Sequence, residues 1–235
     1  MIETAMQPPV LWLTVSRPQA ANALDAATHD ALAAALREAA RRPGVGAVVL
    51  AAAGGKAYSA GADLREFSEW PAGRAALRRR ELLLQTLEAL LALGKPVVAA
   101  VQAPAIGAGA MLALACDEIV MADGAWLGFP EAQHGMPTPM GAVLLARRAR
   151  WPVVQRLLQA GERCAAFEAL QAGLADDCVA AGVLPARCQA RAAALAAIPA
   201  HAYAANKAWL NRPLGHALAE AAAYATAHQA SDPSH

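Results

Sequence analysis

Residues 95–117 read KPVVAAVQAPAIGAGAMLALACD and carry no charged side chain between the first position and the last. The stretch is long enough to cross a lipid bilayer, but a proline and two glycines interrupt its middle. Such residues mark turns rather than the interior of one long helix. We therefore predict a buried strand over residues 96–101, a turn, and a helix over residues 107–116.

The composition excludes several functional classes. The chain has 235 residues and a net charge of +1, so we expect neither a nucleic-acid-binding surface nor a polybasic membrane anchor. The N-terminus lacks the basic start and apolar centre of a signal peptide. The four cysteines are scattered and form no metal-binding or redox motif. We expect a cytoplasmic protein with reduced cysteines, no bound metal, and no nucleic-acid or membrane partner.

Strands alternate with helices along much of the chain, which is typical of βαβ units. We predict strands over residues 10–15, 46–52, 96–101, 118–122, 125–129 and 177–179. We predict helices over residues 26–42, 71–93, 107–116, 140–148, 152–160, 166–172, 186–198, 200–211 and 214–229. The expected fold class is α/β, with a core over residues 1–185 and a helical C-terminal region over residues 186–235.

Two loops of small residues are candidates for binding. Residues 59–63 read SAGAD and residues 106–110 read IGAGA, and each loop follows a strand and leads toward a helix. Backbone N–H groups at the start of a helix lack intrahelical partners and suit an anion or a developing oxyanion. Two such loops could each offer one N–H group to a single oxygen. The alternative interpretation is tight packing between strand and helix that simply needs small residues.

Other motifs with glycine-rich loops do not fit. A dinucleotide-binding fingerprint needs a third glycine, but Leu112 stands at that position. No GK[ST] sequence follows, so the loop is not a P-loop, and no serine lies in a G-x-S-x-G nucleophile elbow.

Several blocks of the sequence resemble the enoyl-CoA hydratase/isomerase family, the crotonase superfamily. The resemblance runs from about residue 10 to about residue 222. The blocks, in chain order, are RP followed by NAL at 17–24, AYSAGADL at 57–64, the stretch 95–117 with FPEAQHGMPTPMG at 129–141, and AGERCAAFEALQAGLADDCV at 160–179.

The resemblance implies a fold and a substrate class. The fold would be a spiral of ββα units with two sheets, and its C-terminal helices would drive assembly into a homotrimer or a hexamer. The substrate would be an acyl-CoA thioester, with coenzyme A as part of the substrate and no further cofactor. The N–H groups of Ala62 and Ala108 would hold the thioester oxygen. Ala108 replaces a common family glycine and would be strained if the turn there needed a positive φ.

The resemblance also implies that Glu131 is the catalytic acid and base. Phe129-Pro130 and Met136-Pro137 surround it with apolar residues, and burial would raise the pKa of its carboxyl. From the residues alone, a glutamate in a surface turn is an equally good interpretation.

One residue departs from the family pattern. Hydratases of the family hold a water molecule between two glutamates, and Met111 stands in the place of the first. A single carboxylate can still move a proton between two carbons, so we predict double-bond isomerisation. The alternatives are enoyl-CoA hydration, with another group positioning the water, and a non-catalytic protein that only binds acyl-CoA. The dienoyl isomerases of the family need an aspartate where Pro139 stands here.

The remaining candidate residues are assigned to substrate binding. They are Ala60, Gly61, Asp63, Leu64, Gly107, Met111, Pro130, His134 and Lys56. His134 is either a second proton carrier or a structural residue. Lys56, Lys95 and Lys207 either meet the phosphates of coenzyme A or are simply solvated.

Overall fold

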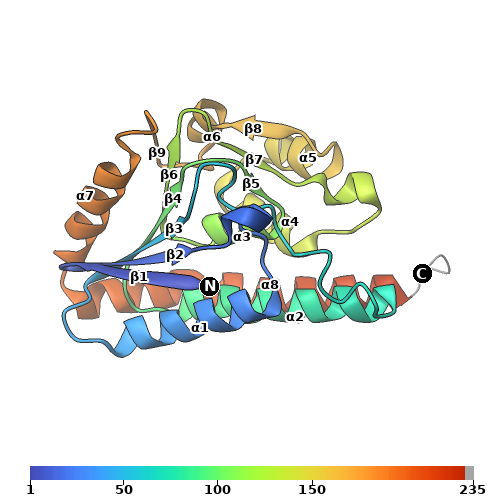
Figure 1. Ribbon diagram of the computed structural model, residues 1–235, viewed down its shortest axis with the longest axis horizontal. Coiled ribbons are helices and arrows are strands. Elements are labelled where there is room, and N and C mark those ends of the chain that lie inside the picture. The colour runs from blue at the N-terminus through green and yellow to red at the C-terminus, as the bar shows by residue number, and fades with distance from the viewer. Residues whose placement is uncertain (231–235) are drawn as a thin grey trace.

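The computed structural model describes residues 1–230 and shows two β-sheets surrounded by helices (Figure 1). Within these residues the larger sheet has six strands in the order β1-β2-β3-β4-β6-β9. Their bounds are β1 (Ile2–Gln7), β2 (Val10–Val15), β3 (Ala47–Ala52), β4 (Val97–Val101), β6 (Glu118–Ala122) and β9 (Asp177–Val179). β1 and β2 are antiparallel, and all the other neighbours are parallel.

The smaller sheet lies beside the larger one and has the order β5-β7-β8. Its strands are β5 (Ala105–Ile106), β7 (Trp126–Gly128) and β8 (Arg163–Ala165). The presence of two sheets with crossover helices confirms the predicted α/β class.

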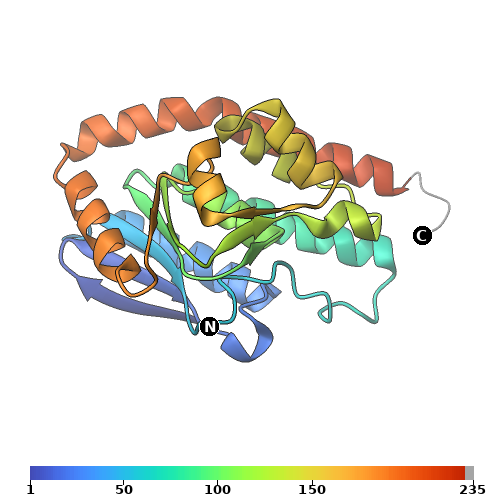
Figure 2. The same cartoon turned by 90° about the horizontal axis from the view of Figure 1, so that it is seen from above.

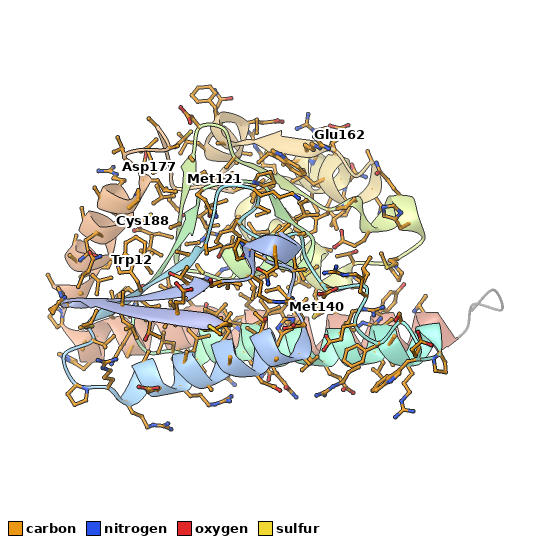
Figure 3. All side chains as sticks on the ribbon, in the orientation of Figure 1. Trp12, Met121, Met140, Glu162, Asp177 and Cys188 are labelled. Carbon is orange, nitrogen blue, oxygen red and sulfur yellow. The ribbon has the colours of Figure 1, made fainter. Side chains whose placement is uncertain are left out.

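The helices cover the sheets and pack against one another. Their bounds are η1 (Pro18–Ala20), α1 (Ala26–Arg41), α2 (Ala72–Ala92), α3 (Ala108–Leu114), η2 (Pro130–His134), α4 (Pro139–Arg148), α5 (Trp151–Gln159), α6 (Ala166–Ala172), α7 (Leu184–Ala196) and α8 (Ala200–Ala230). α7 packs on strands β2, β3, β4 and β6, whereas α8 packs on α2 and α4 (Figure 2). Trp12 of β2 donates from Nε1 to Gln189 of α7 at 2.7 Å, and Trp12 and Cys188 are labelled between these elements in Figure 3.

Local chemistry explains where the elements begin. α1 starts at Asp25, whose side chain accepts a hydrogen bond from the backbone N–H of Thr28. β3 and β4 are almost entirely buried and consist of alanine, valine and leucine, as expected for central strands of a parallel sheet. The region between them holds α2, which supplies the crossover connection.

Three strands and one helix differ from the sequence prediction. The sequence gives no signal for β1, β5 or β8, because β1 is largely exposed and the other two are only two or three residues long. The two helices predicted over residues 200–211 and 214–229 are a single helix, α8, with Pro213 inside it. Proline removes one backbone hydrogen bond from a helix, but packing of α8 on α2 and α4 outweighs that loss.

Lys207 has a structural role that the sequence did not indicate. Its Nζ lies 2.6 Å from Asp117 Oδ2 and donates to the Lys95 carbonyl, and its side chain is only 5% exposed. Asp117 Oδ2 also accepts from the N–H of Val97 at 2.8 Å. The ion pair of Lys207 and Asp117 therefore links α8 to the start of β4. The interpretation of Lys207 as a solvated or phosphate-binding residue is wrong.

None of the helices formed by residues 1–230 is long and apolar enough to cross a membrane.

Replacing Lys207 should destabilise the fold strongly. In Lys207→Met the carboxylate of Asp117 stays buried without its cation, and breaking a buried ion pair in this way costs about 3–5 kcal/mol of unfolding free energy. The double variant Lys207→Met/Asp117→Asn should recover part of that loss. Urea denaturation measures both values, with Lys56→Met as the matched control because Lys56 is exposed. An equal stability of Lys207→Met and Lys56→Met would contradict the assigned role.

Candidate active site

The loop at residues 59–63 is clamped between two neighbouring segments. The N–H of Leu24 donates to the Gly61 carbonyl at 2.8 Å, and the N–H of Asp63 donates to the Leu24 carbonyl at 2.9 Å. On the other side, the N–H of Ile106 donates to the Ser59 carbonyl at 2.9 Å. The backbone of the loop is therefore fixed on both sides.

Ser59 determines which N–H group of the loop stays available. Its Oγ donates to the Asn22 carbonyl at 2.8 Å and accepts from the N–H of Gly61 at 3.2 Å. With the N–H groups of Gly61 and Asp63 both bonded, the N–H of Ala62 between them has no acceptor among residues 1–230.

The second available N–H group belongs to Ala108. Ala108 is the first residue of α3, where a backbone N–H has no intrahelical partner, and no other described residue accepts from it. The positive φ of this turn falls on Gly107, at +51°, and not on Ala108. The alanine therefore occupies its position without the strain that a positive φ would bring.

Glycines at two positions allow these segments to approach each other. Gly61 has a φ of +88°, and a Cβ there would lie 2.9 Å from the Ile106 carbonyl oxygen and 3.5 Å from the Ala108 nitrogen. A Cβ on Gly107 would overlap the carboxylate of Glu131 and lie 3.2 Å from its Cδ. The loop of Gly61, the start of α3 and the side chain of Glu131 thus meet at one point.

Small residues also serve packing, as the alternative interpretation proposed. A Cβ on Gly109 would lie 2.5 Å from Ser59 Cβ, so Gly109 lets α3 pack directly on the loop. Packing therefore explains Gly109, whereas binding of an oxyanion by the two loops stays a prediction.

Glu131 lies in η2 and is mostly removed from solvent. Its Oε2 is buried and has no hydrogen-bond partner among the described residues. Burial raises the pKa of this carboxyl above its ordinary value, while a hydrogen bond from its own backbone lowers the pKa in part. A buried carboxyl group with a raised pKa and an unpartnered oxygen is a candidate for proton transfer.

A cavity of about 260 Å³ opens at this meeting point. Ten of the predicted site residues line it: Ala60, Gly61, Ala62, Leu64, Gly107, Ala108, Met111, Pro130, Glu131 and His134. Met140 of α4, labelled in Figure 3, contributes to the same wall. The structure therefore brings these ten predicted residues together around one cavity. Their roles toward a substrate stay predictions.

Two of the predicted residues lie outside the cavity wall. Asp63 is buried and accepts from Arg17 at 3.1 Å and from Arg65 at 3.3 Å. Burial raises the pKa of Asp63, but the hydrogen bonds from the two arginines outweigh it and leave the pKa lowered. Lys56 is exposed on the preceding loop. Substrate binding by either residue stays a prediction.

Lys95 is occupied by the scaffold. Its Nζ donates to the carbonyls of Ala39 at 2.6 Å and Arg42 at 3.1 Å, at the C-terminal end of α1. A cation in this position stabilises the unpaired carbonyls of a helix end, so Lys95 does not act as a solvated lysine.

His29 lines the cavity and was missed by the sequence analysis. Its Nδ1 lies 2.8 Å from Thr86 Oγ1, and the Thr86 hydroxyl donates to the Leu82 carbonyl at 3.0 Å. The hydroxyl therefore accepts from Nδ1–H of the histidine. Burial lowers the pKa of His29 to about 4, which keeps the ring neutral at pH 7. The only sequence signal was its position three residues before Leu32 on the buried face of α1.

Arg79 and Arg80 of α2 also line the cavity and were not predicted. Within residues 1–230 no group of three or more histidine, cysteine, aspartate or glutamate side chains is arranged to hold a metal ion.

Comparisons with known proteins agree with this architecture. Residues 6–235 match the sequence profile described as enoyl-CoA hydratase/isomerase. A 2,3-dehydroadipyl-CoA hydratase of Escherichia coli is 36% identical over a region that covers 72% of this chain and 65% of that protein.

Solved structures show the same fold. An enoyl-CoA hydratase from Mycobacterium avium subsp. paratuberculosis superposes with a TM-score of 0.85 at 28% identity, over 99% of this chain and 91% of that one. An enoyl-CoA isomerase of Mycobacterium tuberculosis gives a TM-score of 0.87 at 25% identity, over 96% and 97%. These likenesses confirm the predicted crotonase-like fold.

Replacing Gly107 tests the close approach of α3 and Glu131. In Gly107→Ala the new methyl group overlaps the carboxylate and the residue takes a φ of +51°, so we expect a loss of roughly 1–3 kcal/mol in unfolding free energy and a displaced Glu131. Chemical denaturation and a crystal structure of the variant check both effects.

Gly124→Ala is the matched control, since Gly124 has ordinary φ and no atom within 4 Å of a new Cβ. If Gly107→Ala keeps the stability of that control and leaves Glu131 in place, the steric account of the site is wrong.

Proposed function

Because the chain belongs to the enoyl-CoA hydratase/isomerase family, we propose that it moves the double bond of an enoyl-CoA thioester with Glu131 as its acid and base. The observation that carries this proposal is that Glu131 is the one acidic residue among the described residues lining the cavity. Its carboxylate lies against Gly107, the residue that precedes Ala108.

The two amides stabilise the intermediate. When a base removes a proton from the carbon next to the thioester carbonyl, negative charge develops on the carbonyl oxygen. The N–H groups of Ala62 and Ala108 donate hydrogen bonds to that oxygen, and each donor of this kind contributes about 2.7–4 kcal/mol to transition-state stabilisation. Both amides are held in place by the backbone, so little reorganisation accompanies the reaction.

Glu131 carries the proton from one carbon to another. In a 3-enoyl-CoA, the ionised carboxylate takes a proton from C2, and the C–H electrons form a dienolate. The protonated carboxyl then returns the proton to C4, which gives the 2-enoyl-CoA and restores the carboxylate. One group completes the cycle because the number of protons on the enzyme is unchanged.

Hydration is the second candidate reaction, since relatives carry hydratase names. Addition of water needs a group that takes a proton from the water and a group that protonates C2. Met111 lines the cavity in the place where a second carboxylate would help, and methionine cannot transfer a proton. We therefore propose that hydration is the slower reaction.

We also propose assembly into a homotrimer or a hexamer. Trp209 and Leu210 of α8 are 71% and 66% exposed, and neighbouring large apolar side chains on a surface favour contact with another subunit.

Two assays on the same enzyme distinguish the reactions. We expect isomerisation of 3-hexenoyl-CoA to proceed faster than hydration of crotonyl-CoA, measured by chromatography of the acyl-CoA products. The Glu131→Gln variant should lose roughly 10²–10⁴-fold in kcat for isomerisation.

The stability of Glu131→Gln separates chemistry from folding. Burial raises the pKa of Glu131, so the ionised carboxylate destabilises the native state as the pH rises above its usual titration range near 4.5. At pH 7 the neutral glutamine should therefore leave the unfolding free energy equal or higher. Full turnover in a folded Glu131→Gln variant would refute the assignment, and acyl-CoA binding without turnover in the wild type would identify a non-catalytic binding protein.

Proline at position 108 removes one proposed oxyanion donor selectively. Ala108 is the first residue of α3, where proline is well tolerated because the N–H has no helical partner. We expect Ala108→Pro to lower kcat by about 10²–10³-fold and to retain its helical circular dichroism spectrum. Ala200→Pro, at the first position of α8, is the matched control. Equal kcat values for the two variants would show that the Ala108 amide has no catalytic role.

A further inference from the structure

The histidine that α1 brings to the cavity has no part in the proposed reaction. His29 is only 4% exposed, and it lines the cavity together with Leu83 of α2. Its Nδ1 lies 2.8 Å from the hydroxyl of Thr86, which follows Leu83 by one turn of α2. The imidazole ring is therefore held between two helices at the border of the space that we assign to the acyl chain.

The other ring nitrogen of His29, Nε2, is a polar atom that the scaffold leaves open. No residue of the described chain forms a hydrogen bond with it. It is also not one of the fully enclosed side-chain atoms that lack a partner, which belong to Tyr58, Gln102, Glu131 and Asn211. Nε2 therefore keeps accessible surface, and the surface that His29 keeps borders the cavity.

The hydrogen bond to Thr86 determines which proton the imidazole carries. The Thr86 hydroxyl has one hydrogen and donates it to the Leu82 carbonyl at 3.0 Å, so it accepts from Nδ1–H of the histidine. Burial lowers the pKa of His29 to about 4, against the opposing effect of Asp25 and Asp30, and the ring is neutral at pH 7. In this tautomer Nε2 carries a lone pair and no proton.

Nε2 is the one side-chain acceptor that α1 and α2 contribute to the described cavity wall. Besides His29, these helices contribute Ala76, Arg79, Arg80 and Leu83, and a guanidinium can only donate. A keto oxygen of a ligand has no proton to give to Nε2, whereas a hydroxyl group has one. This part of the wall therefore distinguishes a hydroxyl from a keto group.

We infer that His29 forms a subsite for a hydroxyl group on the acyl chain, with Nε2 as the acceptor. This inference rests on the proposed function, because it assumes that the acyl chain occupies the cavity. In the proposed reaction C2 to C4 exchange protons and the double bond at Glu131, so the hydroxyl belongs to C5 or a later carbon. The preferred acyl chain then carries a hydroxyl there, rather than a methylene or a keto group.

Ligands that share coenzyme A and chain length test the subsite. They are heptanoyl-CoA, the 5- and 6-hydroxyheptanoyl-CoAs in both enantiomers, and the 5- and 6-oxoheptanoyl-CoAs. We expect isothermal titration calorimetry at pH 7 to show that the best hydroxy ligand binds about fivefold more tightly than heptanoyl-CoA and than the matching oxo ligand. In His29→Phe, which keeps a ring but removes the acceptor, both ratios should fall to near one.

The Thr86→Val variant tests the tautomer without changing the cavity wall, since Thr86 does not line it. Valine has nearly the shape of threonine but no hydroxyl, so Nδ1–H would be buried without an acceptor and the ring would carry its proton on Nε2 instead. Nε2–H can donate to a keto oxygen, and the preference for the hydroxy over the oxo ligand should therefore disappear. A histidine that only packs would not change this ratio.

His201→Phe is the matched control. His201 is exposed on α8 and does not line the cavity, so the same substitution there should keep both wild-type ratios. Circular dichroism establishes that each variant is folded. If His29→Phe does not fold, the ratio of hydroxy to oxo affinity in Thr86→Val decides the question.

The outcomes separate the subsite from the proposed reaction. Wild-type ratios near one, or ratios that His29→Phe or Thr86→Val leaves unchanged, overturn the subsite. An equal loss of affinity for all the ligands in His29→Phe also overturns it and assigns Nε2 to an amide of coenzyme A. A preference for the hydroxy ligand without any isomerase activity supports the subsite and refutes the proposed reaction. If no ligand binds, both fail.

Discussion

The absence of a side chain at Gly107 is the constraint on which the rest of the site depends. The carboxylate of Glu131 occupies the space that a Cβ would fill, and the backbone there has a φ of +51°, which favours glycine. With any larger residue, the side chain of Glu131 would have to turn away from the start of α3. The carboxyl group would then leave the amide of Ala108, and the two parts of the proposed machinery would separate.

The scaffold keeps both amides available by satisfying their neighbours. Ser59 takes up the N–H of Gly61, and Leu24 pairs with the backbone on either side of Ala62. On the other segment, α3 begins at Ala108, so its first N–H has no helical partner. Most buried backbone groups in proteins are paired. Within residues 1–230, two N–H groups without acceptors and a buried carboxyl oxygen without a partner line one cavity, which is therefore a feature that the surrounding structure maintains.

Much of this could be predicted from the sequence, and the failures have physical causes. The strands 10–15, 118–122 and 177–179 and the helix 166–172 have their predicted bounds, and the first two strands are largely apolar runs that specify a strand locally. Pro213 misled the prediction because tertiary packing overrides local propensity. Arg79 and His29 were missed because only the packing of α1 and α2 brings them to the cavity. The cytoplasmic location, the absence of a further cofactor, and trimerisation through residues 186–235 stay predictions.

A crystal structure with a bound, non-reacting hexanoyl-CoA tests the central claim most directly. The account predicts that the thioester oxygen lies at hydrogen-bond distance, about 3 Å, from the backbone nitrogens of both Ala62 and Ala108. Carbon C2 should then face the carboxyl group of Glu131. A thioester oxygen bound by other groups, or amides of Ala62 and Ala108 that point away from it, would contradict the account.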